Sequence, residues 1–102
     1  KYPLPACDVP AAYLSTRIGA RGPMFSPVAA CATGAHAIAL GAQLIEDGYA
    51  DVALCGALEN SLSPLMIAAY RQLGAFSKSG VMRPFDQQRD GFVPREGLAL
   101  LV

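Results

Sequence analysis

The sequence predicts an α/β protein in which helices alternate with short strands. Two kinds of apolar segment point to it: Ala-rich runs of helical length, and shorter runs with the continuous apolar pattern of buried strands. Glycine, proline and serine separate these segments and mark the turns between them. Their order along the chain is helix, strand, helix, strand, helix, loop, strand, which is typical of a layered α/β fold.

The first expected elements are a helix and a short strand. Asp8 and Pro10 favour a helix start, so we expect a helix over residues 10–18 that ends at Gly19. Residues 24–29 are predicted to form a short strand. A proline in this segment cannot donate a ladder hydrogen bond, which favours a position at a sheet edge or an interface.

The clearest helix of the chain is expected over residues 32–47. It is rich in alanine, and Gly48 follows its end. His36 and Gln43 are the only polar side chains in its interior, so it has no polar face. We therefore expect it to be buried on all sides.

The second half of the chain is expected to contain two strands around one helix. Residues 50–56 have the pattern of a core strand, and a helix should run from Ser63 or Pro64 to about residue 73. A long polar loop is expected over 77–89. The chain should end in a strand over 91–102, interrupted near its Pro-Arg-Glu sequence, and so apolar that we expect it to be buried on both faces.

The composition indicates that this chain buries its apolar surface against something else. Hydrophobic residues make up 53% of the 102 residues and charged residues 16%, against about 25% charged in an ordinary soluble domain. A domain of this size leaves much of its surface exposed, and so few charges cannot cover it. We expect another subunit, or more of the same chain, to cover it. The first and last residues also suggest a chain truncated at both ends.

Charge and cysteine content exclude several classes of function. The net charge is zero, so we expect neither nucleic acid nor an anionic membrane surface as a partner. The longest apolar stretch, 33–45, is shorter than the roughly 18 residues of a membrane span, and no targeting segment is evident, which predicts a cytoplasmic protein. Three widely spaced cysteines predict neither disulfides nor a metal site. No glycine-rich phosphate loop occurs.

The turn around Cys31 is the most informative stretch for chemistry. Small residues surround the cysteine where the expected strand gives way to the expected helix. Unpaired N–H groups and the macrodipole at a helix N-terminus favour the thiolate of a cysteine held there, and small neighbours allow a carbonyl to approach. Cys31 is the candidate nucleophile. On this turn alone, a buried small cysteine remains the stronger alternative.

The remaining titratable residues have structural interpretations. His36 lies about 500° along the helix from Cys31, roughly 140° net, so we expect a core histidine and a catalytic base from outside this chain. Cys7 and Cys55 are expected to be small structural residues, and Glu59 a turn or cap carboxylate. We expect an ion-pair and hydrogen-bond scaffold in the long loop. Its charged members are Arg83, Asp86, Arg89 and Asp90.

Motifs in order along nearly the whole chain resemble those of the β-ketoacyl-acyl-carrier-protein synthases, particularly the elongating ketosynthases of type II fatty-acid and polyketide synthesis. These motifs are Arg21-Gly22-Pro23, Ala30-Cys31-Ala32-Thr33-Gly34 with His36, the run from Asp51 to Gly56 with Glu59, Ser63-Pro64-Leu65, Arg83-Pro84-Phe85-Asp86 and Arg89-Asp90-Gly91-Phe92-Val93.

The resemblance implies a thiolase-like fold, a layered αβαβα architecture of which residues 1–102 would form part of the N-terminal half. It assigns to Cys31 the role of the nucleophile that receives the acyl group, with its backbone N–H in the oxyanion hole. It places Tyr70 in the lining of the acyl-chain pocket. It also implies that segment 24–29 pairs with its twin across the two-fold axis of a homodimer.

The same resemblance implies the reaction and its partner. Acyl transfer from an acyl carrier protein to Cys31 is followed by decarboxylative Claisen condensation with a malonyl-carrier protein. The substrates are carried on phosphopantetheine, and no other cofactor and no metal is expected. Two histidines and a lysine from the family's C-terminal half support the decarboxylation and are absent here, so we expect the isolated chain to be inactive.

Two other functions remain open at this point. One is a non-catalytic ketosynthase-like partner subunit of the chain-length-factor type, which would form a heterodimer. The cysteine at position 31 argues against it, because such subunits lack the nucleophile. The other is a non-enzymatic packing module, against which the ordered motifs argue.

Overall fold

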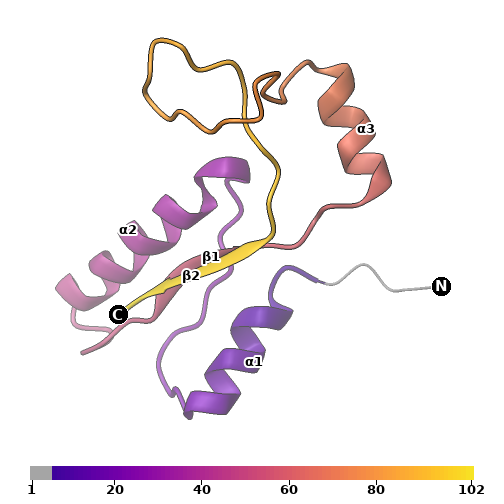
Figure 1. Cartoon of the computed structure of the whole chain (residues 1–102). Helices are drawn as coiled ribbons and strands as arrows, with labels where there is room; N and C mark the ends of the chain where they lie inside the picture. Colours follow the sequence, from indigo (N-terminus) through magenta and orange to yellow (C-terminus); the bar gives the residue numbers. More distant parts are fainter. Residues whose placement is uncertain (1–5) are drawn as a thin grey trace. The chain divides into compact units, whose positions relative to one another are not determined.

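A computed structural model describes residues 6–102 of the chain (Figure 1). They divide into two compact units, one formed by the described residues up to Ala57 with Ala99–Val102, and the other by Leu58–Leu98. The elements along the chain are α1 (Val9–Ile18), a 3-10 turn η1 (Ala30–Ala32), α2 (Thr33–Glu46), β1 (Cys55–Glu59), α3 (Pro64–Gln72) and β2 (Gly97–Leu101). The mixed helix and strand content agrees with the expected α/β class.

Helix α1 confirms the expected first helix at both ends. It begins one residue before Pro10, whose missing N–H costs nothing in the first turn. Asp8 occupies the N-cap position, but its side chain makes no capping hydrogen bond. The helix ends at Gly19, whose left-handed φ of 68° lets its N–H bond back to the Ser15 carbonyl.

Helix α2 has the expected length but is not buried on all sides. Its shielded positions follow a helical repeat and form one stripe: Thr33, Gly34, Ala37, Leu40, Gly41 and Leu44. Only Gly41 of these is fully buried. The positions between them are exposed, Ile38 and Ile45 included. The prediction of complete burial was wrong for this chain because an apolar surface is buried only where another element covers it.

Segment 24–29 is not a strand, contrary to expectation. The chain has no regular secondary structure there, and within the described part of the chain no strand pairs with it. A strand is defined by its hydrogen-bond partner, and Pro27 also removes one of the donors that a partner would use. Phe25 and Val28 are exposed.

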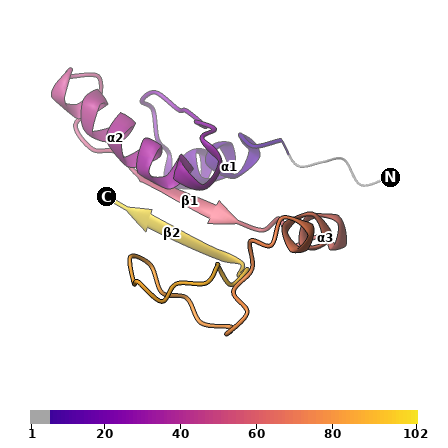
Figure 2. The same cartoon turned by 90° about the horizontal axis from the view of Figure 1, so that it is seen from above.

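The two strands pair with each other but occupy shorter ranges than predicted. β1 covers Cys55–Glu59 rather than 50–56, and β2 covers Gly97–Leu101 rather than 91–102. Figure 2 shows that they run in opposite directions. Gly56 lies against the Ala99 carbonyl so closely that a Cβ atom there would overlap it. The apolar pattern predicted where strands occur, whereas the partner determined where pairing begins and ends.

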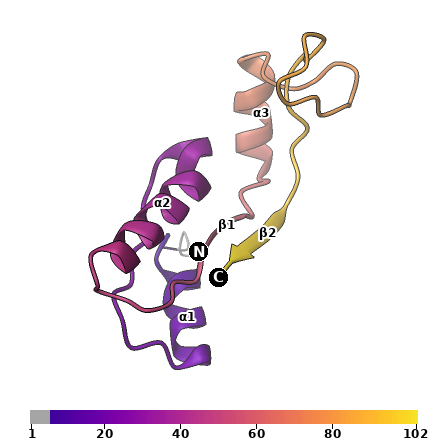
Figure 3. The same cartoon turned by 90° about the vertical axis from the view of Figure 1, so that its left-hand side faces the viewer.

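Helix α3 begins at a local capping signal. The Ser63 hydroxyl accepts a hydrogen bond from the Met66 N–H at 3.2 Å, and Pro64 occupies the first helical turn. These features confirm the expected start of the helix. Figure 3 shows the long loop that follows α3 and leads into β2. Residues 77–90 contain no helix or strand, as expected.

A close backbone contact ties the end of this loop to the residues after α3. Phe76 and Phe92 form an isolated parallel bridge, with hydrogen bonds from Phe92 N–H to the Ala75 carbonyl and from Ser77 N–H to the Phe92 carbonyl. Gly91 has a φ of 133°, and a Cβ there would collide with the backbone of Phe76 and Ser77. Only glycine fits this approach.

The described residues contain no fully buried large side chain. β2 is exposed along its whole length, so the expectation of a strand buried on both faces was wrong for this chain. Leu98 is 62% exposed and Val102 94%. The expected excess of apolar surface is therefore present. No helix in the described part of the chain combines the length and apolarity needed to cross a bilayer.

Candidate functional site

Cys31 lies at the middle of η1, the 3-10 turn that leads directly into α2. It is exposed, and its thiol is free. The cysteine is therefore neither sealed in the interior nor placed in the middle of the helix. A thiol here is accessible to a substrate and lies directly before the first turn of a helix.

The turn that carries Cys31 is held by four hydrogen bonds. The Ala32 N–H donates to the Ala29 carbonyl at 2.9 Å, and the Thr33 N–H donates to the Ala30 carbonyl. The Thr33 hydroxyl donates to the Ala30 carbonyl at 2.8 Å and accepts from the Ala29 N–H at 3.0 Å. The residues on both sides of the cysteine are thus tied together.

Ala30 has an unusual backbone conformation, with a φ of 48°. The left-handed region costs a non-glycine residue on the order of 1–3 kcal/mol and persists only where surrounding contacts impose it. The hydrogen bonds of the turn are such contacts. The backbone immediately before the cysteine is therefore constrained and strained.

The first turn of α2 rests closely on β1. A Cβ at Gly34 would lie 3.4 Å from the Ala57 side chain, and a Cβ at Gly41 would overlap the Cys55 sulfur. Small residues therefore let the helix that follows Cys31 approach the strand. Cys55 is a half-buried packing residue, as expected, and Cys7 is exposed.

His36 is exposed, so the interpretation as a core histidine was wrong. It lies on the uncovered side of α2, next to the shielded stripe that contains Gly34 and Ala37. The helical spacing does not determine which faces of the helix are covered by other elements.

Tyr70 lies in the second unit, on α3, and packs in an aromatic cluster. Its ring centroid is 5.9 Å from that of Phe76 and 5.2 Å from that of Phe92, and the two phenylalanine rings are 5.2 Å apart. Two of these contacts are edge-to-face, a favourable arrangement. All three side chains are half-buried. Cys31 belongs to the first unit.

Asp90 organises the long loop through hydrogen bonds. Its carboxylate accepts from the Ser77 hydroxyl at 2.6 Å, the Ser79 N–H at 2.8 Å and the Ser79 hydroxyl at 3.2 Å. These donors, the Ser77 hydroxyl first, lower the pKa of Asp90 from 3.8 to about 2. Glu59 behaves similarly: the hydroxyl and N–H of Ser61 lower its pKa, which confirms the interpretation as a turn carboxylate.

Of the ion pairs and hydrogen bonds expected among the loop charges, the structure shows the hydrogen bonds. Asp86 accepts from the Gln88 N–H at 2.7 Å, and Arg89 donates to the Asp86 carbonyl at 2.9 Å. The side chains of Asp86, Arg89 and Asp90 make hydrogen bonds to backbone and serine groups rather than ion pairs. Arg83 takes part through its backbone carbonyl, which accepts from the Asp86 N–H. Exposed charges gain little by pairing, whereas backbone N–H groups in an irregular loop need acceptors.

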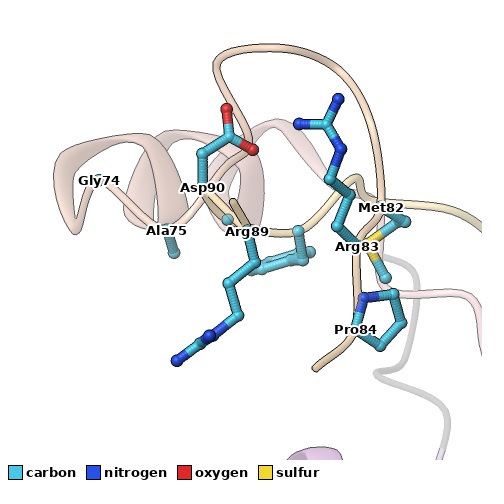
Figure 4. Close-up of a pocket in the computed structure, with 9 residues that line it drawn as sticks. Gly74, Ala75, Met82, Arg83, Pro84, Arg89 and Asp90 are labelled. Atoms are coloured by element: carbon cyan, nitrogen blue, oxygen red, sulfur yellow. The ribbon is translucent and has the colours of Figure 1, made fainter. Parts of the chain in front are cut away.

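An open hollow of about 520 Å³ lies beside this loop, in the second unit. Its lining includes Met82, Pro84, Arg83 and Arg89. Figure 4 shows that the two arginine side chains point away from each other. They do not converge on a single anion. Residues 6–102 contain no group of three or more His, Cys, Asp or Glu side chains that could hold a metal ion.

Sequence reasoning singled out Cys31 but missed two residues that shape its turn. The positive φ of Ala30 has no signal in the sequence, because alanine adopts it only under constraint. Thr33 did have a signal. Threonine at the start of a helix commonly bonds nearby backbone, and its position two residues after the cysteine could have drawn attention to it.

Residues 5–102 match the family described as Beta-ketoacyl synthase, N-terminal domain. Since this match covers nearly the whole chain, the chain belongs to the β-ketoacyl synthase family. The resemblance inferred from the motifs is thereby confirmed.

Individual relatives are a polyketide synthase subunit and a 3-oxoacyl-acyl-carrier-protein synthase. The chain is 40% identical over 89 residues to the tetracenomycin polyketide synthase ketoacyl synthase alpha subunit of Streptomyces glaucescens, covering 82% of this chain and 21% of that protein. It is 34% identical over 105 residues to 3-oxoacyl-[acyl-carrier-protein] synthase 2 of Synechocystis sp., covering 98% of this chain and 25% of that protein.

A solved structure with the same arrangement belongs to AntDE:AntF, a type II PKS acyl-carrier protein in complex with its ketosynthase bound to the hexaketide. The match has a TM-score of 0.78 and 33% identity, and covers 88% of this chain and 24% of that one. The thiolase-like α/β class is thus confirmed. The chain spans about a quarter of the length of these relatives.

Proposed function

We propose that this chain is part of the N-terminal half of a β-ketoacyl-acyl-carrier-protein synthase and carries its nucleophile, Cys31. The observation that carries the proposal is the exposed free thiol in the turn that opens α2, within a chain matched to this family over residues 5–102. Such a position combines access for an acyl group with nearby helix N–H groups.

The first step is transfer of an acyl group to Cys31. The Cys31 sulfur attacks the thioester carbonyl of an acyl-phosphopantetheine. A bond forms from that sulfur to the carbonyl carbon, and the bond from that carbon to the phosphopantetheine sulfur breaks. The carrier leaves as a thiol with the proton that Cys31 gives up, and the cysteine N–H is proposed to stabilise the intermediate oxyanion.

The second step is a condensation that releases the enzyme. A malonyl-carrier protein loses carbon dioxide, and the electron pair left on its α-carbon attacks the acyl group on Cys31. A carbon–carbon bond forms, the bond to the Cys31 sulfur breaks, and the thiolate that is released takes up a proton from water. The histidines and the lysine that the family uses here lie outside this chain. We therefore propose that residues 1–102 alone do not catalyse condensation.

The proposed partners are an acyl carrier protein and a second ketosynthase subunit. An acyl carrier protein accompanies the ketosynthase in the structural relative, which supports the first. The partly exposed segment 24–29 supports the second, because no strand pairs with it among residues 6–102 and an extended segment of this kind can pair with its twin in a homodimer or with a similar subunit. Free thiols suit the reducing cytoplasm, the proposed location.

Tyr70 is proposed to line the pocket for the acyl chain. Its ring is held by Phe76 and Phe92, so the aromatic cluster would present a firm apolar wall. Replacement by alanine is expected to change which chain lengths are accepted, while acylation of Cys31 with the shortest acyl groups continues.

An acyl-thioester probe tests the proposed function. The complete polypeptide that carries this sequence is incubated with acyl-phosphopantetheine, and labelled peptides are identified by mass spectrometry. We expect Cys31 to be acylated in preference to the exposed Cys7 and the half-buried Cys55, and Cys31→Ala to abolish the label. Equal labelling of all three thiols, or none at Cys31, would contradict the proposal and favour a non-catalytic subunit.

A further inference from the structure

The turn around Cys31 has little packing to hold it in place. Ala30, Cys31 and Ala32 are all exposed, so neighbouring side chains do not enclose the backbone at the cysteine. The strained φ of Ala30 also has to be maintained by something. In the described structure, the contacts that hold this turn are its hydrogen bonds.

The Thr33 hydroxyl makes two of these bonds, one as a hydrogen-bond acceptor and one as a donor. It accepts from the Ala29 N–H at 3.0 Å and donates to the Ala30 carbonyl at 2.8 Å. Its two partners are the two residues that immediately precede Cys31. Thr33 is itself half-buried at the first position of α2, so the hydroxyl is anchored to the helix.

We propose that Thr33 is a positioning residue for the reaction at Cys31: its hydroxyl fixes the backbone that aims the thiol and the cysteine N–H. This inference rests on the proposed function. β-branching restricts the χ1 of Thr33, and its bond to the carbonyl three residues earlier selects one of the remaining rotamers. The hydroxyl therefore holds the backbone of Ala29 and Ala30 in one conformation.

The expected effect is on turnover rather than on substrate binding. Acyl transfer needs the sulfur and the oxyanion donor placed together, and a misplacement on the order of 1 Å can cost about 100-fold in rate. Loss of the hydroxyl leaves the Ala29 N–H without this acceptor and lets the strained turn relax. Tyr70, the residue proposed to line the acyl-chain pocket, takes no part in these hydrogen bonds.

The test compares four proteins in Cys31 acylation by acyl-phosphopantetheine, all as the complete polypeptide. They are the wild type, Thr33→Val, which keeps the shape but removes the hydroxyl, Thr33→Ser, which keeps the hydroxyl, and Thr16→Val. The last is a matched control, because the Thr16 hydroxyl also bonds a backbone carbonyl, that of Ala12 in α1. Melting temperatures are measured alongside.

We expect Thr33→Val to lower kcat for acylation roughly 10- to 100-fold with KM changed less than about threefold. Thr33→Ser should retain kcat within about fivefold, and Thr16→Val should leave it unchanged. A merely structural role would lower the melting temperature without this division between kcat and KM. If Thr33→Val does not fold, Thr33→Ala replaces it, with the same expected loss of kcat.

Thr33→Val, or Thr33→Ala in its place, acting at the wild-type kcat would overturn this inference and leave the proposed function intact. Thr33→Ser falling as far as Thr33→Val would also overturn it, because the hydroxyl would then not be the cause. A wild type that takes no acyl group at Cys31 would instead overturn the proposed function and this inference together.

Discussion

Gly41 shows how one missing side chain positions α2 on β1. It is the fully buried residue of the helix, and a Cβ at this position would overlap the Cys55 sulfur and lie 3.3 Å from the Ala53 Cβ. Helix and strand approach each other as closely as these atoms allow. Since Cys31 lies in the turn that opens the same helix, this contact also helps to determine the position of Cys31.

Gly41→Ala is expected to destabilise the protein by about 1–3 kcal/mol, because overpacking forces the helix off the strand. The free energy of unfolding of the complete polypeptide is measured by urea titration. Gly22→Ala is the control, since a Cβ there meets no atom within 4 Å. Adding Cys55→Ala should restore part of the loss by removing the sulfur. A Gly41→Ala protein as stable as the control would contradict the described packing.

Asp90 predicts a pH-dependent stability of the long loop. Its folded pKa of about 2 lies below the ordinary 3.8, mainly because of the Ser77 hydroxyl, so the ionised form stabilises the folded state. This contribution is complete above about pH 4 and is lost as the pH falls toward about 2. Removal of the Asp90 carboxylate should remove this contribution and leave that of Glu59, whose pKa is also lowered.

The measurement is the melting temperature of wild type and Asp90→Asn across this pH range. We expect the variant to melt lower above pH 4 and the difference to shrink as the pH falls. Ser77→Ala should give a similar loss at neutral pH, since it removes the 2.6 Å hydrogen bond. A difference that stays constant down to low pH would show that the carboxylate charge is not the cause.

At the scale of elements, local signals and long-range pairing behave differently. The starts of α1 and α3 were predicted because proline at the first turn and serine at the N-cap act on residues within one turn. The strands were misplaced because a ladder depends on a partner far along the sequence. Segment 24–29 has a strand pattern, but no strand pairs with it among residues 6–102.

The N-cap of α3 gives a prediction at this scale. Ser63→Ala is expected to cost about 1 kcal/mol of stability, because the Met66 N–H loses its acceptor. Ser63→Asp should retain most of it, since aspartate also accepts this bond and suits the helix dipole. Urea unfolding of the complete polypeptide gives both values. Equal losses in the two variants would mean that the cap does not stabilise α3.

At the scale of the whole molecule, many large hydrophobic side chains of the described residues are exposed. No large side chain is fully buried among the described residues, and Phe85 is 100% exposed with a left-handed φ of 64°. A surface of this kind is normally covered by another polypeptide. The relatives are about four times longer than this chain, so further residues of such a polypeptide are available to cover this surface.

Residues 1–102 produced alone should therefore bind a hydrophobic dye and self-associate. We expect increased ANS fluorescence, and species larger than a monomer in sedimentation velocity. Thermal unfolding of the same chain should give a broad transition. The complete polypeptide is the control and should bind far less dye per chain. A monomeric chain with a sharp transition and little dye binding would show that it covers its own apolar surface.

The sequence by itself determined the family, the candidate nucleophile, the helices α1 and α3 and the excess of apolar surface. Each of these depends on residue type and short spacing, which are fixed in the chain before it folds. The tertiary structure alone decided which face of α2 is covered, where the strands pair, that His36 is exposed and that Thr33 braces the turn at Cys31. Burial and hydrogen bonding each require a second group that folding brings close. The sequence does not specify which groups come into contact.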